Sequence, residues 1–107
     1  MIMMPETLDP SELQTYRTPA FVTLVDGTEL FVGDSTVTEQ GWLRVDTWGG
    51  ERTHYPPQQV RSRTLVETET AADGDELCQF RRVTDDQLRH EARELGGIDR
   101  SREAIEA

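Results

Sequence analysis

Residues 21–66 consist of short segments in which apolar and polar side chains alternate, separated by glycine-containing turns. A period of two places successive side chains on opposite faces of a β-strand. In one such segment, Leu43 and Val45 point to the predicted core, whereas Trp42 points to the opposite face. This pattern predicts a small antiparallel β-barrel.

Turn residues divide the stretch into strands. Asp26-Gly27 and Gln40-Gly41 indicate tight hairpins, because glycine accepts the positive φ that such turns require. Gly33 is expected to turn a corner of the barrel, and Trp48-Gly49-Gly50 to form a hairpin tip. The predicted strands are residues 20–25, 29–32, 35–39, 42–47, 51–55 and 60–70, with a 3₁₀ turn or an extended corner at residues 56–59. The first strand is apolar on both faces, so we expect both to be buried.

The order of these turns, with Tyr55-Pro56-Pro57 before the last strand, resembles that of SH3-like small barrels. The opening Val22-x-Leu24-x-Asp26-Gly27, followed by Gly33, also resembles the first motif of Sm-like proteins. The chain departs from the Sm-like pattern in two places: the second glycine comes one residue late, and the last strands contain no Arg-Gly pair where those proteins clamp RNA bases. The resemblance rests on turn chemistry that unrelated barrels share, so it implies a fold and no activity.

The chain is predicted to be a single, mainly β (α+β) domain: an SH3-like barrel with an extended hairpin and a C-terminal helix. Its length of 107 residues suffices for one modest core. The segments are a lead-in over residues 1–19, the barrel over 20–70, a hairpin return strand over 71–83 and a helical segment over 84–107.

The segments that flank the barrel are less constrained. The lead-in is expected to lay Leu8, Leu13 and Tyr16 over one open end of the barrel, and a frayed N-terminus is the alternative. Asp73-Gly74 indicates a turn from which residues 76–83 return as a projecting arm. A solvated acidic linker is the alternative there.

The C-terminal segment contains the clearest helix pattern. Thr84-Asp85-Asp86-Gln87 is typical of a capping box, with the threonine as the predicted cap. Leu88, Ala92 and Leu95 recur at helical spacing and form a narrow apolar stripe. Gly96-Gly97 is expected to end the helix. The residues after it are predicted to form either a second short helix or a frayed tail.

All 11 basic residues are arginine, and with 21 acids they leave a formal net charge of −10. An acidic, lysine-free composition resembles the proteomes of haloarchaea, whose cytoplasm holds molar salt. At about 1 M salt the Debye length is about 3 Å, so the self-repulsion of such a surface is screened. An acidic protein from a GC-rich mesophile is the alternative. Either way, the charge disfavours non-specific nucleic-acid binding.

The sequence also bears on the cellular location. A single cysteine, Cys78, allows no internal disulfide and indicates a reducing compartment. No stretch approaches the roughly 18 consecutive apolar residues of a membrane span. We therefore expect a cytoplasmic protein without a membrane partner.

Residues suited to catalysis or metal binding are sparse. Cys78, His54 and His90 are the only soft metal ligands, and no two of them have a recognised ligand spacing. With two histidines in the chain, a nucleophile, base and orienting group have few ways to meet. We expect no bound metal, no cofactor and no enzymatic activity.

Residues 40–66 are the only locally positive stretch, with four arginines against two acids. Arginine beside aromatic side chains is typical of recognition surfaces. The alternative is that the arginines pair with neighbouring acids and that the tryptophans belong to the core. The candidate binding residues are Trp42, Arg44, Trp48, Arg52, Tyr55, Arg61 and Arg63.

These observations predict a binding or adaptor module that recognises a protein partner or a second copy of itself. A homodimer is expected, because small barrels often close exposed edges by oligomerising. The alternative is a nucleic-acid-binding regulator that uses the four arginines. It is less favoured, since phosphate contacts would have to survive molar salt.

Overall fold

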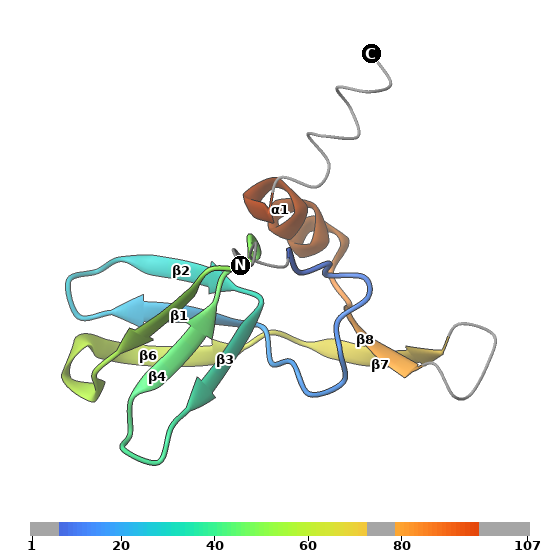
Figure 1. The fold of residues 1–107 in the computed structure, drawn as a ribbon. Coiled ribbons are helices and arrows are strands. Elements are labelled where there is room, and N and C mark those ends of the chain that lie inside the picture. The colour runs from blue at the N-terminus through green and yellow to red at the C-terminus, as the bar shows by residue number, and fades with distance from the viewer. Residues whose placement is uncertain (1–6, 73–78, 97–107) are drawn as a thin grey trace, which may run out of the picture.

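The computed structural model describes residues 7–72 and 79–96, which form a mainly β fold with one α-helix (Figure 1). The predicted class, antiparallel strands with a C-terminal helix, is confirmed. The strands are β1 (Ala20–Leu24), β2 (Glu29–Val32), β3 (Asp34–Val37), β4 (Leu43–Asp46), β5 (Arg52–Tyr55), β6 (Val60–Leu65), β7 (Thr68–Ala72) and β8 (Gln79–Val83); the helices are the 3₁₀ helix η1 (Pro57–Gln59) and α1 (Asp86–Gly96).

The first six strands form two three-stranded antiparallel sheets, in the orders β2–β1–β6 and β3–β4–β5. Gly33 lies between β2 and β3, so the chain passes from the first sheet to the second at the predicted corner. Within residues 7–72 and 79–96, no strand pairing joins the two sheets, and these strands therefore form no closed barrel.

The predicted hairpin turns are confirmed. Gly27 has a φ of 94° between β1 and β2, and Gly41 has a φ of 87° between β3 and β4. Glycine adopts this conformation without the clash that a Cβ would cause. Pro56 and Pro57 precede β6 in the predicted corner, which takes the 3₁₀ form as η1 because neither proline can donate to a strand ladder.

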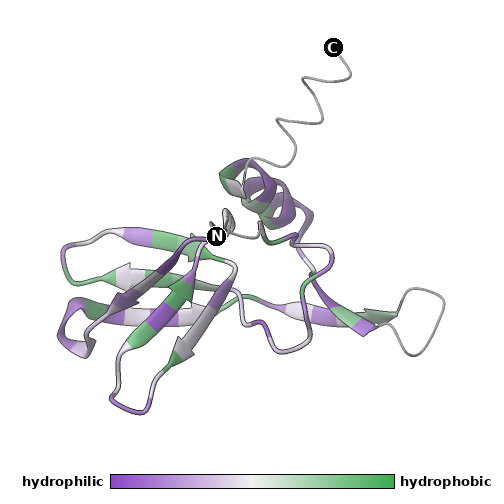
Figure 2. Ribbon diagram, viewed as in Figure 1, coloured by the Kyte–Doolittle hydropathy of each residue, from purple (hydrophilic) through white to green (hydrophobic). Residues whose placement is uncertain are grey.

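One core cluster lies between the two sheets. The predicted inward set of β4 is confirmed, and Figure 2 shows hydrophobic and hydrophilic residues alternating along this strand. The cluster consists of Ala20, Val22, Val32, Leu43 and Val45, with Leu24, Leu30, Tyr55 and Val60 packed at its margin.

The prediction that β1 is buried on both faces is wrong for one face. Val22 is fully buried, but Phe21 on the opposite face remains 37% exposed. Phe21 stacks on Phe31 of β2, with 4.7 Å between the ring centroids. Phe31 in turn contacts Trp48, so Phe21 is the more exposed member of the pair.

A second cluster joins the N-terminal segment to the helix. The Leu8 N–H donates to the Trp48 carbonyl at 2.9 Å, and Leu13 exchanges two backbone hydrogen bonds with Arg81 at 2.7 and 2.8 Å. These hydrogen bonds attach the described part of the lead-in to the rest of the fold. This cluster consists of Leu8, Leu13, Trp48, Val83 and Ala92, with Phe31, Val66 and Leu88 packed against it.

Tyr16 does not join this cluster, and its predicted burial is wrong. Its side chain is 65% exposed. The Tyr16 hydroxyl donates to Gln14 Oε1 at 2.6 Å, and the Arg17 guanidinium lies 5.1 Å from the centre of its ring. Contacts within the segment thus hold Tyr16 on the surface.

Strands β7 and β8 form a separate two-stranded hairpin that extends away from the two sheets (Figure 1). Thr68 lies opposite Val83 at its base, and Ala72 lies opposite Gln79 toward its tip. The hairpin prediction, rather than the linker alternative, is confirmed for these strands. The predicted turn at Asp73-Gly74 lies outside the described residues.

The prediction of one long strand over residues 60–70 is wrong, because the chain is divided into β6 and β7. At the break, the Val66 N–H donates to the Pro19 carbonyl at 2.9 Å. Val66 also packs against the second core cluster. These contacts with the N-terminal segment turn the chain out of the first sheet.

The predicted helix is confirmed as α1, but its cap lies one residue later than predicted. Asp85 Oδ1 accepts hydrogen bonds from the N–H groups of Gln87 at 2.8 Å and Leu88 at 3.2 Å, the pattern of an N-cap. The Thr84 hydroxyl instead lies 3.5 Å from the carbonyl oxygen of Glu67.

The apolar stripe of α1 is only partly buried. Ala92 is fully buried and Leu88 packs beside it, whereas Leu95 is 62% exposed at the last turn. The predictions for residues 98–107 concern a part of the chain outside the described residues.

Candidate binding surface

The outer face of the β3–β4–β5 sheet contains several of the predicted binding residues. Leu43 and Val45 point into the core, so Arg44 and Asp46, which alternate with them, point outward. Cross-strand register defines two rows on this face, Thr36–Arg44–His54 and Asp34–Asp46–Arg52.

Asp34 is only 1% exposed. Its Oδ1 accepts the Thr18 N–H at 2.8 Å. Its Oδ2 lies 3.0 Å from Arg17 Nη1 and 3.1 Å from Arg44 Nη2. A buried carboxylate is tolerated only when it is paired and hydrogen-bonded, and these contacts from the N-terminal segment and from β4 provide both.

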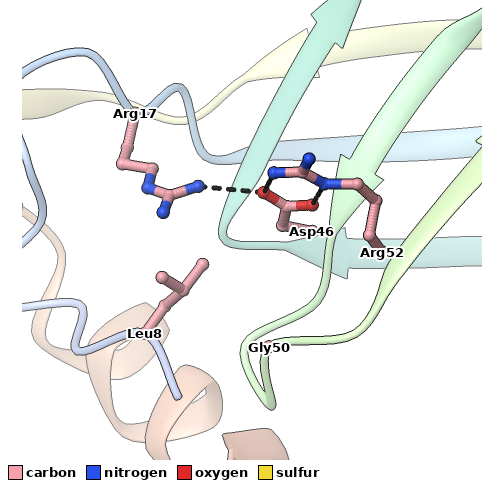
Figure 3. Close-up of a pocket in the computed structure, with 5 residues that line it drawn as sticks. All are labelled: Leu8, Arg17, Asp46, Gly50 and Arg52. Carbon is pink, nitrogen blue, oxygen red and sulfur yellow. Dashed lines mark hydrogen bonds and ion pairs between the residues drawn. The ribbon is translucent and has the colours of Figure 1, made fainter. Parts of the chain in front are cut away.

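Asp46 is 5% exposed and pairs with two arginines (Figure 3). Arg52 holds it through two nitrogens, Nε at 2.8 Å and Nη2 at 3.1 Å, and Arg17 Nη1 lies 2.9 Å away. Burial raises the pKa of Asp46, but the hydrogen bonds and charge of Arg52, with smaller effects of Arg44 and Arg17, outweigh it and lower the pKa below 3.8. The same hydrogen bonds to Asp46 raise the pKa of Arg52.

Arg17 therefore joins both carboxylates, and three arginines surround two aspartates. Because Arg44 and Arg52 pair with Asp34 and Asp46, their charges are largely compensated within the protein. For these two arginines, the structure agrees with the alternative in which arginines pair with neighbouring acids. The arrangement pairs two buried carboxylates with arginine and fastens the N-terminal segment to the sheet.

The two remaining predicted arginines lie on β6. Arg63 reaches across to β3, where its Nε donates to Ser35 Oγ at 2.9 Å and its Nη2 to the Ser35 carbonyl at 3.2 Å. Arg61 is exposed, and it forms no ion pair within the described part of the chain. The structure thus brings Arg44 and Arg52 together on the outer face of the sheet, through Asp34 and Asp46, while Arg63 contacts β3 at Ser35 and Arg61 lies apart from them.

Trp42 lies on the surface at the start of β4, on the predicted face. Its side chain is 44% exposed. The hairpin that holds it is closed by the Thr38 N–H, which donates to the Trp42 carbonyl at 2.8 Å. Trp42 lines a shallow hollow of about 360 Å³ together with Thr38, Gln40 and His54.

The predicted surface position of Trp48 is wrong. Trp48 follows β4 in the expected turn, but its side chain is 0% exposed and belongs to the second core cluster. Its ring meets the edge of Phe31, with 5.2 Å between centroids. Tyr55 is half-buried against the cluster between the sheets. Of the three predicted aromatic residues, only Trp42 belongs to the outer face.

Sequence reasoning missed Arg17, Asp34 and Asp46 as members of this site. Asp46 lies in the predicted strand 42–47, where aspartate is depleted, and this was the available signal; Asp34 lies between the predicted strands 29–32 and 35–39 and gave none. Arg17 offered no comparable signal, because its two partners are 17 and 29 residues away in the sequence.

The described residues were also compared with the requirements of metal sites and membrane-spanning helices. Among residues 7–72 and 79–96, no group of three His, Cys, Asp or Glu side chains is placed to hold a metal ion, and Cys78 lies outside these residues. None of the described helices has the length and apolar character needed to cross a membrane. Comparisons of the chain with protein-family models, curated proteins and solved structures found no match.

Proposed function

We propose that this protein is a non-enzymatic binding or adaptor module that acts through protein–protein contacts at the surface around Trp42. The supporting observation is that Trp42 is 44% exposed on an ordered hairpin. Tryptophan is enriched among the residues that contribute most to binding at interfaces. The neighbouring Thr38, Gln40 and His54 supply the polar rim that interfaces generally have.

The partner that we propose for this surface is a second copy of the chain. A two-fold axis beside Trp42 would bring the two indole rings together. Among the described residues, no strand pairs with the outer side of β5, and small sheets often cover such an edge by association. The net charge of −10 opposes self-association at low salt but is screened in a halophile-type cytoplasm, where we propose that the protein acts.

We further propose that the two sheets are the halves of an SH3-like barrel. In support, β2 and β3 follow each other through Gly33 as one bent strand shared between the sheets. The short helix η1 connects β5, an edge strand of the second sheet, to β6, an edge strand of the first. The chain itself therefore joins the two sheets at these edges.

A nucleic-acid-binding regulator has less support. Phosphate binding requires available guanidinium groups, but Arg44 and Arg52 pair with buried aspartates and Arg63 donates to Ser35. Nucleic-acid binding would also weaken steeply with salt. Retention on duplex or single-stranded nucleic acid in molar salt would favour this alternative.

The experiment is to compare Trp42→Ala with the wild type by sedimentation in molar salt and by urea unfolding. We expect a dimeric wild type and a monomeric variant, with the free energy of unfolding changed by less than about 0.5 kcal/mol, as for most surface substitutions. Tyr16→Ala is the matched control, because Tyr16 is also an exposed aromatic residue but lies outside this surface. A wild-type mass of one chain would overturn the self-association, and a dimeric Trp42→Ala would overturn the role of Trp42.

A further inference from the structure

A second surface, distinct from that of Trp42, lies between β2, β5 and the end of α1. It is a groove of about 480 Å³, within the range of volumes typical of ligand sites. Its apolar lining comes from both core clusters and from the helix, and includes Leu30, Phe31, Val32, Val45, Tyr55 and Leu95.

The groove is flanked by two strand edges. β2 is the outer strand of the first sheet, and β5 is the outer strand of the second. An edge strand presents unpaired backbone N–H and C=O groups along one side. An extended polypeptide laid along either edge can pair with these groups while alternate side chains enter the groove. We propose that the groove binds an extended peptide segment with large apolar side chains next to arginine or lysine.

The charge of the groove selects the basic residues of this peptide. Glu29 and Glu51 line it, and no arginine, lysine or histidine is among the described residues that do so. The whole chain has a formal net charge of −10. At low salt, a cationic segment is therefore attracted to the groove, whereas nucleic acid is repelled.

Leu95 supports the apolar part of the proposal. It is the last residue of the helical stripe, and it remains 62% exposed although it lines an apolar groove. An exposed large apolar side chain that continues an apolar groove is typical of a binding site. An apolar side chain of the peptide would cover Leu95 and contact the partly buried Phe31 and Tyr55.

The test uses the full chain with Trp42→Phe, which leaves as the only tryptophan Trp48, buried beneath the groove and in contact with Phe31 of its wall. The probe is a short synthetic peptide of alternating leucine and arginine, titrated at low salt while Trp48 fluorescence is recorded. We expect a saturable change in Trp48 emission. A serine–arginine peptide of equal charge and a leucine–glutamate peptide of equal apolarity are expected to produce none. Because Trp42→Phe alters the Trp42 surface but not the groove, peptide binding by this variant tests the groove alone. Either proposal can therefore fail without the other.

Two variants locate the peptide. Charge reversal with Glu29→Lys and Glu51→Lys together is expected to weaken binding roughly tenfold. Leu95→Arg, at an exposed position that tolerates substitution, is expected to weaken it by a similar factor, and thermal unfolding checks that both variants fold. The proposal is overturned if the serine–arginine peptide binds equally well, if neither variant weakens binding, or if the free protein is a dimer that Leu95→Arg dissociates.

Discussion

Arg17 Nη1 lies 2.9 Å from Asp46 Oδ2, across 29 residues of sequence. The same nitrogen lies 3.0 Å from Asp34 Oδ2, so one guanidinium group connects the N-terminal segment to both β3 and β4. Because the Arg17 side chain is only 12% exposed, salt screens these ion pairs less than it screens surface pairs. Leu8 and Leu13 hold the same segment through the second core cluster.

Arg17→Met is expected to lower the free energy of unfolding by about 2 kcal/mol, less than the roughly 3–5 kcal/mol of a buried ion pair that loses its only partner. The loss is smaller because Arg44 still pairs with Asp34, and Arg52 with Asp46. Urea unfolding measures it. Arg61→Met, on the exposed surface of β6, is the control and should change stability by less than about 0.5 kcal/mol. Equal losses in the two variants would contradict the prediction.

The stability of the protein is expected to fall in acid through Asp46. Burial raises the pKa of Asp46, but Arg52 lowers it by a larger amount. The pKa in the folded state therefore lies below the ordinary 3.8. A group with a lowered folded-state pKa stabilises the fold above its unfolded pKa, and this contribution is lost as the pH falls through the folded value. The stability difference between wild type and Asp46→Asn should therefore be constant near neutral pH and shrink below about pH 4. Urea unfolding across this range measures it, and a difference that grows in acid would refute the assignment.

The strands were predictable because their signals are local. Alternation identified the inward set Leu43 and Val45, and glycine placed the turns at Gly27 and Gly41. The break between β6 and β7 was not predictable, since it depends on a hydrogen bond from Val66 to Pro19 at the other end of the chain.

The positions of the candidate surface residues were predictable only where the alternation of a strand determines which way a side chain points. Trp42 continues the outward alternation of β4 and is exposed, as expected. Trp48 lies in a turn, where alternation no longer determines direction, and its burial results from Leu8 and Phe31, which are distant in sequence. The pairing of arginines with aspartates likewise depends on a tertiary contact, because any of the 21 acids could have been a partner.

The position of the helix cap gives a prediction with an adjacent control. Asp85→Ala removes the oxygen that accepts the Gln87 and Leu88 N–H groups and is expected to cost about 1 kcal/mol. Thr84→Ala loses only a 3.5 Å contact with the Glu67 carbonyl, so its effect should be about 0.5 kcal/mol or less. Thermal unfolding of both variants compares the two positions. If Thr84→Ala lowered the stability more than Asp85→Ala does, Thr84 would be the cap, as predicted from the sequence.

Gly33 is expected to admit no side chain, because the core closes directly over it. A Cβ there would lie 2.6 Å from Leu8 Cδ1 and 3.0 Å from Trp48 Cε3, so either the N-terminal segment or the indole must move. Gly33→Ala should therefore lower the free energy of unfolding by about 1–3 kcal/mol, as overpacked cores do. Its matched control is Gly49→Ala, whose Cβ would meet only Thr47 Oγ1 at an ordinary 3.9 Å. Urea unfolding followed by Trp48 fluorescence in the Trp42→Phe background reports both stability and the indole environment. If both alanine variants match their parent in stability and emission, Trp48 does not pack over Gly33.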